Sequence, residues 1–202
     1  MRIARVNPFL AFIVVSCGVW GHAANAGFFT PASPPVRKAS DLLRKQEPPK
    51  VNKALEAVIT PDNSRVTVSL TTQRLLLRTG DQVYIDTPVS TGKRAGMTPT
   101  GTFQISEKDP NHRSSVYGTF VDSQNRVVRD GVSLKVDSAP SGTHYIGAPM
   151  KWFCRITDTG VGMHIGILPG YAASHGCVRL PAEIAPLIYQ KVKVGTTVVI
   201  EP

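Results

Sequence analysis

Residues 163–180 read MHIGILPGYAASHGCVRL, and they hold two of the five histidines and one of the three cysteines of the chain. Glycines stand close to the reactive side chains: Gly166 follows His164 by two positions, and Gly176 directly precedes Cys177. A thiol and an imidazole in one short stretch can form a nucleophilic site, a metal site, or part of a buried core.

Acyl transfer by a thiolate needs a base that reaches the sulfur, a group that orients the base, and backbone N–H groups that meet the oxyanion. Cys177 supplies the thiol, and a loop can fold His164 back onto it as the base. The N–H groups of Gly176 and Cys177 are the candidate oxyanion donors. If residues 177–179 are extended, Arg179 faces the same side as Cys177 and can bind a substrate carboxylate. We expect these surroundings to lower the pKa of the thiol from about 8.5 toward neutrality.

Two structural alternatives compete with this interpretation. Cys154 and Cys177 are the cysteines that follow the first 26 residues, and two cysteines in an oxidising compartment usually form one disulfide. However, Cys154 lies in KWFCRI between bulky apolar residues, which is typical of a small core side chain. A zinc site from His164, His175 and Cys177 is the second alternative. No CxxC or HxxxH spacing supports it, so no metal is expected.

The flanking sequence predicts a mostly β domain. From about residue 57, apolar and polar residues alternate with a period of two, as in half-buried strands. Strands are expected in SRVTVSL (64–70), QRLLLR (73–78), QVYIDTPVSTG (82–92), TPTGTFQI (98–105) and VGTTVVIEP (194–202), with a hairpin turn at TGD (79–81) and short strands scattered over 108–159. PAEIAPLIYQKV (181–192) is the one clear helix, and Pro181 suits its first turn.

Residues 1–26 are predicted to be a secretory signal peptide. Arg2 and Arg5 precede the apolar run FLAFIVVSCGVW, and the small-x-small pattern AlaAsnAla ends at Ala26. The run is shorter than the roughly 20 residues of a membrane-spanning helix. VVSC (14–17) also resembles a lipoprotein processing box, which would lipidate Cys17 and attach the protein to a membrane. Cleavage after Ala26 is the preferred interpretation.

The proline-rich, basic residues 27–56 are predicted to be a linker, which leaves residues 57–202 as a single domain. The net charge is +9, and loss of the two leader arginines leaves +7. An exported basic protein is attracted to anionic polymers and membrane surfaces. No nucleic-acid-binding motif is present, so nucleic acid is not an expected partner.

A family resemblance follows from these residues. His164-x-Gly166 together with SHGCVRL (174–180) resembles the signature of the L,D-transpeptidase family, which has a YkuD-type catalytic domain. LTTQRLLLRTGDQVYIDTPVSTG (70–92) and TPTGTFQISEKDP (98–110) are also similar, so the resemblance covers about residues 60–202. It implies a sandwich-like domain of mixed β-sheet. It also implies a cysteine that attacks the meso-diaminopimelate–D-alanine bond of a peptidoglycan stem peptide. No cofactor is expected, because the thioester carries the bond energy.

The resemblance assigns roles by position. Cys177 is the expected nucleophile and His164 the base, while the rest of the expected catalytic site is Ser174, His175, Gly176 and Arg179. Ser174, His175 and Gly176 would shape the site and its oxyanion hole, with His175 bracing the loop rather than acting as base. Tyr145 and Trp152 lie where the family carries a lid and are the candidate substrate contacts. The nine residues between His164 and Ser174 are fewer than in many members, which should alter the mouth of the cleft and the choice of acceptor.

The expected protein is therefore a transpeptidase of the periplasm or cell envelope that acts on peptidoglycan stem peptides, with an envelope protein as another candidate acceptor. Carbapenems acylate the cysteine of this family, so a covalent adduct is expected on Cys177. An L,D-carboxypeptidase or a thiol amidase on the same fold remains an alternative, because water can replace the acceptor amine. A non-catalytic wall-binding module is a third, and the intact Cys177, His164 and Arg179 argue against it.

Overall fold

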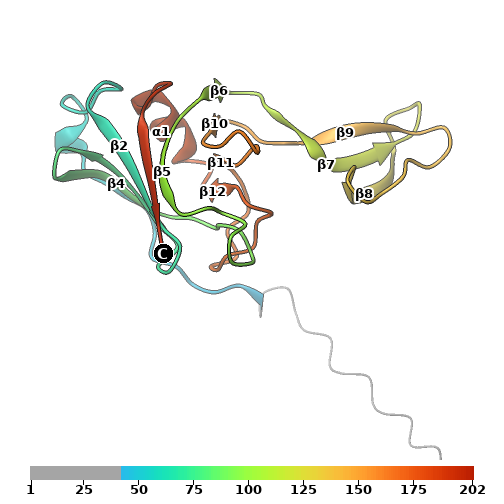
Figure 1. Ribbon diagram of the computed structural model, residues 1–202, viewed down its shortest axis with the longest axis horizontal. Coiled ribbons are helices and arrows are strands. Elements are labelled where there is room, and N and C mark those ends of the chain that lie inside the picture. The colour runs from blue at the N-terminus through green and yellow to red at the C-terminus, as the bar shows by residue number, and fades with distance from the viewer. Residues whose placement is uncertain (1–41) are drawn as a thin grey trace, which may run out of the picture. The chain divides into compact units, whose positions relative to one another are not determined.

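The computed structural model describes residues 42–202. The predicted signal peptide, Cys17 and the first part of the predicted linker lie outside these residues. The described chain consists mostly of strands, with one α-helix, and Figure 1 shows three sheets arranged one after another. No helix within residues 42–202 is long and apolar enough to cross a membrane.

The largest sheet has six strands. In spatial order they are β1 (Lys50–Val51), β4 (Gln82–Pro88), β3 (Arg74–Thr79), β2 (Ser64–Ser69), β13 (Thr197–Glu201) and β5 (Gly101–Gln104). Neighbours are antiparallel except β2 and β13, which are parallel. The predicted alternation is confirmed, because Val66 and Val68 on β2 are fully buried. The predicted hairpin turn lies between β3 and β4, where Gly80 has a φ of +53° that favours glycine.

The second sheet has four strands and carries the motif residues. Its order is β12 (Val178–Leu180), β11 (Gly162–Ile165), β10 (Phe153–Arg155) and β6 (Glu107–Asp109). The core forms where this sheet, the six-stranded sheet and α1 (Ala185–Lys191) bury apolar residues together, which is the expected sandwich-like arrangement. The helix is shorter than predicted: Pro181 accepts backbone bonds in the turn before it, and Pro186 occupies its first turn instead.

The third sheet is more regular than the predicted scatter of short strands. It consists of β8 (Val127–Ser133), β7 (Arg113–Val121) and β9 (His144–Pro149), with β7 in the centre. In Figure 1 this sheet lies on the far side of the four-stranded sheet from the six-stranded one. Residues 127–131 on β8 are all exposed, so this sheet adds little to the apolar core. Its sequence lacks the two-residue alternation that a buried face imposes, which is why the pattern was missed.

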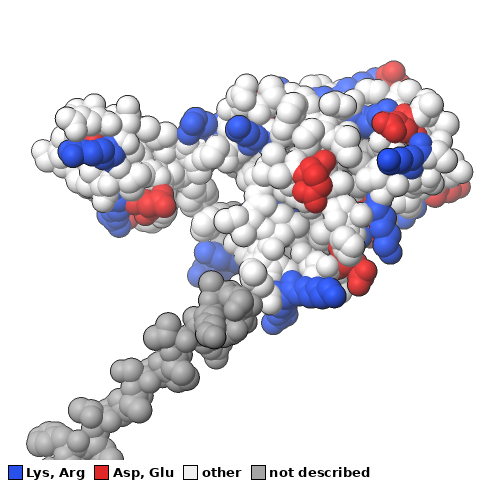
Figure 2. All heavy atoms as spheres, turned by 180° about the vertical axis from the view of Figure 1, so that it is seen from behind, with Lys and Arg blue, Asp and Glu red and all other residues white. Residues whose placement is uncertain are grey.

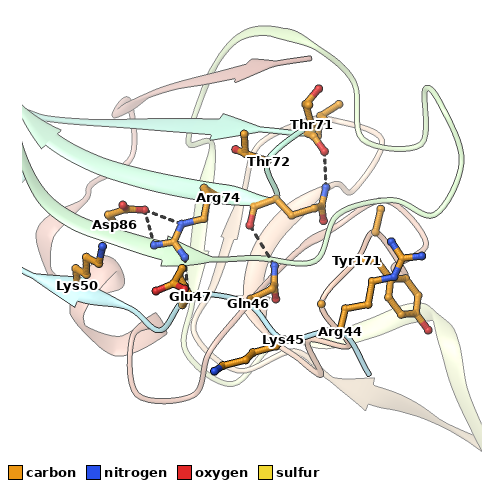
Figure 3. Close-up of a pocket in the computed structure, with 14 residues that line it drawn as sticks. Arg44, Lys45, Gln46, Glu47, Lys50, Thr71, Thr72, Arg74, Asp86 and Tyr171 are labelled. Carbon is orange, nitrogen blue, oxygen red and sulfur yellow. Dashed lines mark hydrogen bonds and ion pairs between the residues drawn. The ribbon is translucent and has the colours of Figure 1, made fainter. Parts of the chain in front are cut away.

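The predicted linker is not all linker, because the structure packs part of it onto the domain. β1 pairs with β4, and the 3-10 helix η2 (Lys53–Leu55) buries Leu55. Figure 3 shows the preceding residues lying beside this sheet: Gln46 donates to the carbonyl of Gln73, and Arg74 donates to the carbonyl of Glu47. Gln46 also donates to the carbonyl of Val89. Sequence reasoning missed these contacts because they are polar and irregular, without apolar periodicity.

This docked segment, residues 44–55, also contacts the loop that leads to Cys177. The Arg44 N–H donates to the carbonyl of Pro169 at 2.8 Å, and the Arg44 guanidinium lies 5.6 Å from the centre of the Tyr171 ring (Figure 3). A Cβ added to Gly170, whose φ is +90°, would collide with the Arg44 carbonyl oxygen. Glycine is therefore required at this position both by its backbone conformation and by the close approach of the segment.

Candidate active site

The register of two parallel strands brings the motif residues together. His164 on β11 is the direct partner of Arg179 on β12, and Met163 is the partner of Val178. Met163 and Val178 are fully buried in the core. Because strand side chains alternate, His164 and Arg179 lie on the opposite face, and so does Cys177 one residue before Val178. His164, Cys177 and Arg179 line one cavity of about 620 Å³ together with Ser174 and His175.

His164 is held as a neutral imidazole with one nitrogen available. Its Nδ1 lies 2.7 Å from the Ile165 carbonyl oxygen, which can only accept, so Nδ1 carries the proton and Nε2 is left with a lone pair. The side chain is buried, and burial, the largest cause, lowers the pKa of His164 to about 4. The Ile165 carbonyl is the orienting group that the sequence required but did not identify.

The surroundings of Cys177 contradict one expectation. Its Sγ donates to the Gly160 carbonyl oxygen at 3.8 Å, and the residue is half-buried in the cavity wall. Burial raises the pKa of the Cys177 thiol above its usual value, although the Gly162 N–H and the guanidiniums of Arg179 and Arg155 oppose this effect. The expected fall toward neutrality was wrong because the sequence shows neighbouring charges but not burial. Cys177 therefore needs a base to become a nucleophile near neutral pH.

Ser174 braces the turn that carries Cys177. Its Oγ donates to the Cys177 carbonyl oxygen at 2.6 Å and accepts from the Gly176 N–H at 3.0 Å. Gly176 has a φ of +136°, and a Cβ there would lie 2.8 Å from the Met97 carbonyl oxygen, so glycine is required. Thr98 Oγ1 donates to the Gly176 carbonyl and ties the turn to a second segment. The Gly176 N–H, expected as an oxyanion donor, is thus engaged within the turn, which leaves the Cys177 N–H as the remaining candidate.

His175 is held between the third sheet and the turn. Its ring stacks on Tyr117 of β7, with centroids 4.4 Å apart and planes 14° from parallel. Its Nε2 lies 3.3 Å from Lys93 Nζ, which can only donate, so Nε2 accepts and the ring is neutral. Burial and the charges of Lys93 and Arg179 lower the pKa of His175. These contacts fit a bracing position and occupy the nitrogen that a base would use.

The remaining predicted residues lie outside the cavity. Tyr145 on β9 donates through its hydroxyl to the Ser114 carbonyl at 3.2 Å, and Trp152 packs edge-on against Tyr189 of α1. Neither belongs to the cavity lining. Cys154 is 1% exposed in the core, burial raises its pKa to about 12, and both Cys154 and Cys177 are free thiols in the structure.

One cluster within the described residues has side chains close enough together to hold a metal ion. Glu107, Asp109 and His112 bring ligand atoms within 4.8 Å of one another. However, Arg155 pairs with Glu107, so a cation of the protein already neutralises one carboxylate of this group. The candidate set of His164, His175 and Cys177 does not form such a group among the described residues.

Sequence reasoning missed most of the cavity wall, including two cations and an aromatic ring. Arg155 ends β10, Lys135 follows β8, and Tyr117 lies in the middle of β7. Arg155 had a weak signal, since it stands two residues from the buried Phe153 on a short strand next to the motif strand. Lys135 and Tyr117 had none, because only the tertiary fold brings the third sheet to the cysteine.

Comparison with known families agrees with this geometry. Residues 63–200 match the family model of the L,D-transpeptidase catalytic domain, YkuD. The chain belongs to this family. The match covers both motif strands and every residue of the cavity. No curated protein matches the chain significantly.

Solved L,D-transpeptidases share the fold. One from Mycobacterium smegmatis is 20% identical with a TM-score of 0.52, covering 69% of this chain and 59% of the other. L,D-transpeptidase 3 from Mycobacterium tuberculosis is 18% identical with a TM-score of 0.50, covering 69% and 61%. An L,D-transpeptidase in complex with imipenem is 22% identical with a TM-score of 0.50, covering 68% and 58%. The chain thus spans less than two thirds of the length of these relatives.

Proposed function

We propose that the protein is an exported, cysteine-dependent L,D-transpeptidase that acts on peptidoglycan stem peptides. The single observation that carries the proposal is the shared face of β11 and β12. There a neutral His164, fixed by the Ile165 carbonyl, lines the same cavity wall as the Cys177 thiol. Membership of the L,D-transpeptidase family supports the reaction and the peptide substrate class.

In the first half-reaction, Nε2 of His164 takes the proton from Cys177 Sγ as the sulfur attacks the acyl carbon. The Cys177 N–H faces the developing oxyanion, and the imidazolium of His164 then gives its proton to the departing amine. The product is a thioester on Cys177. An acceptor amine then attacks the thioester and gives its proton to His164. The C–S bond breaks, the imidazolium protonates the departing sulfur, and the Cys177 thiol is restored.

The protonation states of His164 and Cys177 determine when the proton moves. The imidazole is neutral and the thiol is protonated in the free protein, since burial disfavours the charged form of each. The proton therefore moves only when the sulfur attacks, and Arg179 stabilises the negative charge that forms on the sulfur. This scheme uses no group beyond the chain's own residues and the two peptides.

The test is product analysis with tetrapeptide-bearing muropeptides as donor and acceptor. A transpeptidase yields crosslinked dimers and releases D-alanine, whereas a carboxypeptidase or thiol amidase yields only hydrolysed monomers. Cys177→Ala should remove the product, and Cys154→Ala, which alters a core thiol outside the cavity, is the matched control. Unchanged muropeptides with the folded wild-type protein would favour a wall-binding module and contradict the proposal.

Export is a separate part of the proposal and rests on residues 1–26, together with the basic segment that follows. N-terminal sequencing of the processed protein distinguishes its two routes. Cleavage after Ala26 should leave Gly27 as the first residue, and lipidation should leave a modified Cys17 and a membrane-bound protein. An unprocessed chain that stays in the cytoplasm would contradict export while leaving the chemistry untouched.

A further inference from the structure

The cavity that contains Cys177 is lined by permanent cations and by no acid. Arg155 on β10, Arg179 on β12 and Lys135 after β8 all contribute to its wall, and the described lining residues include neither Asp nor Glu. The face of the molecule in Figure 2 differs, because there basic and acidic side chains are interspersed. A cavity with one sign of charge concentrates ligands of the opposite sign.

Arg155 is fixed in place rather than free to move. Its Nε donates to Glu107 on β6, and its guanidinium carbon lies 5.3 Å from the centre of the Phe153 ring. Its side chain is about one quarter exposed. With Nε engaged, the two terminal nitrogens remain as the donor pair for a ligand, and a guanidinium uses such a pair for bidentate contact with a carboxylate.

The guanidinium of Arg155 lies near Gly160, the residue that contacts Cys177. A Cβ built on Gly160 would lie 3.6 Å from Arg155 Nη1, and the Gly160 carbonyl is the acceptor for Cys177 Sγ. Arg179 approaches from another element, with Nη1 donating to the Ile167 carbonyl at 3.4 Å. An acyl group bound on Cys177 therefore lies within the field of two guanidiniums that come from different strands.

We propose that Arg155, positioned by Glu107, is a specificity-determining residue that binds a free carboxylate of the acyl donor, so that the site selects carboxylate-bearing donors over their amidated counterparts. The proposal rests on the proposed function and narrows its substrate class. A carboxylate accepts two charge-assisted hydrogen bonds from a guanidinium. A primary amide of the same shape offers one oxygen and places N–H donors against the cation. We expect discrimination of about 10-fold to 100-fold in kcat/KM, most of it in KM.

The experiment compares matched tetrapeptide donors with the full-length protein. One donor has all carboxylates free, and two others each have one carboxylate converted to a primary amide. The wild-type protein should prefer the free donor over at least one amidated donor. Arg155→Gln should remove that preference, by slowing the free donor far more than the amidated one, which loses only the effect of the guanidinium on the Cys177 thiol. Arg155→Lys should keep part of the preference, since it retains the charge but not the bidentate geometry.

Two controls separate specificity from folding. Arg65→Gln removes a cation from an exposed position on β2 outside the cavity and should leave the preference intact. Melting temperatures of the Arg155 variants show whether loss of the Glu107 pair unfolds the protein, and Arg155→Lys keeps the test valid if Arg155→Gln is unstable. Glu107→Gln should weaken the preference without removing it, because Arg155 keeps its charge but loses its positioning.

The outcomes are distinct. Equal turnover of free and amidated donors by the wild-type protein would overturn this inference and leave the proposed function standing. Equal slowing of all donors by Arg155→Gln would also overturn it, because Arg155 would then act on the thiol or the fold alone. Absence of turnover with every donor would overturn the proposed function, and this inference with it.

Discussion

The most informative perturbation is a fall in pH, because it tests the buried state of His164. Burial lowers the pKa of His164 to about 4. At pH 5.5 a histidine with an unperturbed pKa near 6.5 would be neutral in only about one molecule in ten, whereas His164 should be neutral in nearly all. The base therefore stays competent, and the acylation rate should be almost constant from pH 7.5 down to 5.5.

The assay is covalent labelling of Cys177 by a carbapenem, followed by intact-protein mass spectrometry across a series of pH values. Labelling avoids the titration of an acceptor amine, so the acid limb reports on the thiol–imidazole pair as a unit. His164→Gln should slow labelling by about 10²-fold to 10⁴-fold at all pH values, the usual contribution of a general base. His175→Gln is the matched control and should cause a much smaller loss with an unchanged acid limb.

Burial of His164 also predicts how the free energy of unfolding changes with pH. Because the folded pKa of His164 lies below its unfolded value, the unfolded chain binds the proton first as pH falls. The free energy of unfolding should be unaffected above about pH 6.5 and should fall by about 3 kcal/mol between pH 6.5 and 4. His164→Gln should lack this component. The labelling assay can refute this reasoning. If the labelling rate declines at low pH with an apparent pKa near 6.5, and this decline disappears in His175→Gln, then His175 is the base and His164 the bracing residue.

Three further predictions follow from other parts of the structure. Iodoacetamide should modify Cys177 and spare Cys154 in the folded protein, because burial raises the pKa of Cys154 to about 12; equal labelling of both, read by peptide mass spectrometry, would contradict this. Tyr117→Ala should slow carbapenem labelling more than Tyr117→Phe does, since only the alanine removes the ring stacked on the motif turn; indistinguishable rates would show that the stack has no role. Gly170→Ala should lower the free energy of unfolding by roughly 1–3 kcal/mol and expose the chain at Arg44 to trypsin, because the added Cβ meets the Arg44 carbonyl; unchanged proteolysis would mean that the docked segment does not depend on this contact.

The sequence determined the candidate residues of the site and most of the central fold. Local spacing was enough to place Cys177 beside a turn-forming glycine, and alternation was enough to predict that Cys177 and Arg179 share one face of an extended stretch. The same period of two marked β2 as a half-buried strand, because burial of one face leaves its imprint in neighbouring residues. These are short-range properties, which one stretch of chain carries by itself.

Only the tertiary structure decided the protonation states of His164 and Cys177 and the composition of the cavity wall opposite Cys177. Desolvation, which raises the pKa of Cys177 and lowers that of His164, depends on atoms brought in from other segments, so the flanking residues predicted the wrong direction for the thiol. Arg155 and Tyr117 reach the cavity from β10 and β7, which belong to different sheets, and no local pattern encodes how those sheets meet. Trp152 was a candidate substrate contact, but its ring packs against Tyr189 of α1 instead. A contact of this kind leaves no local pattern in the sequence.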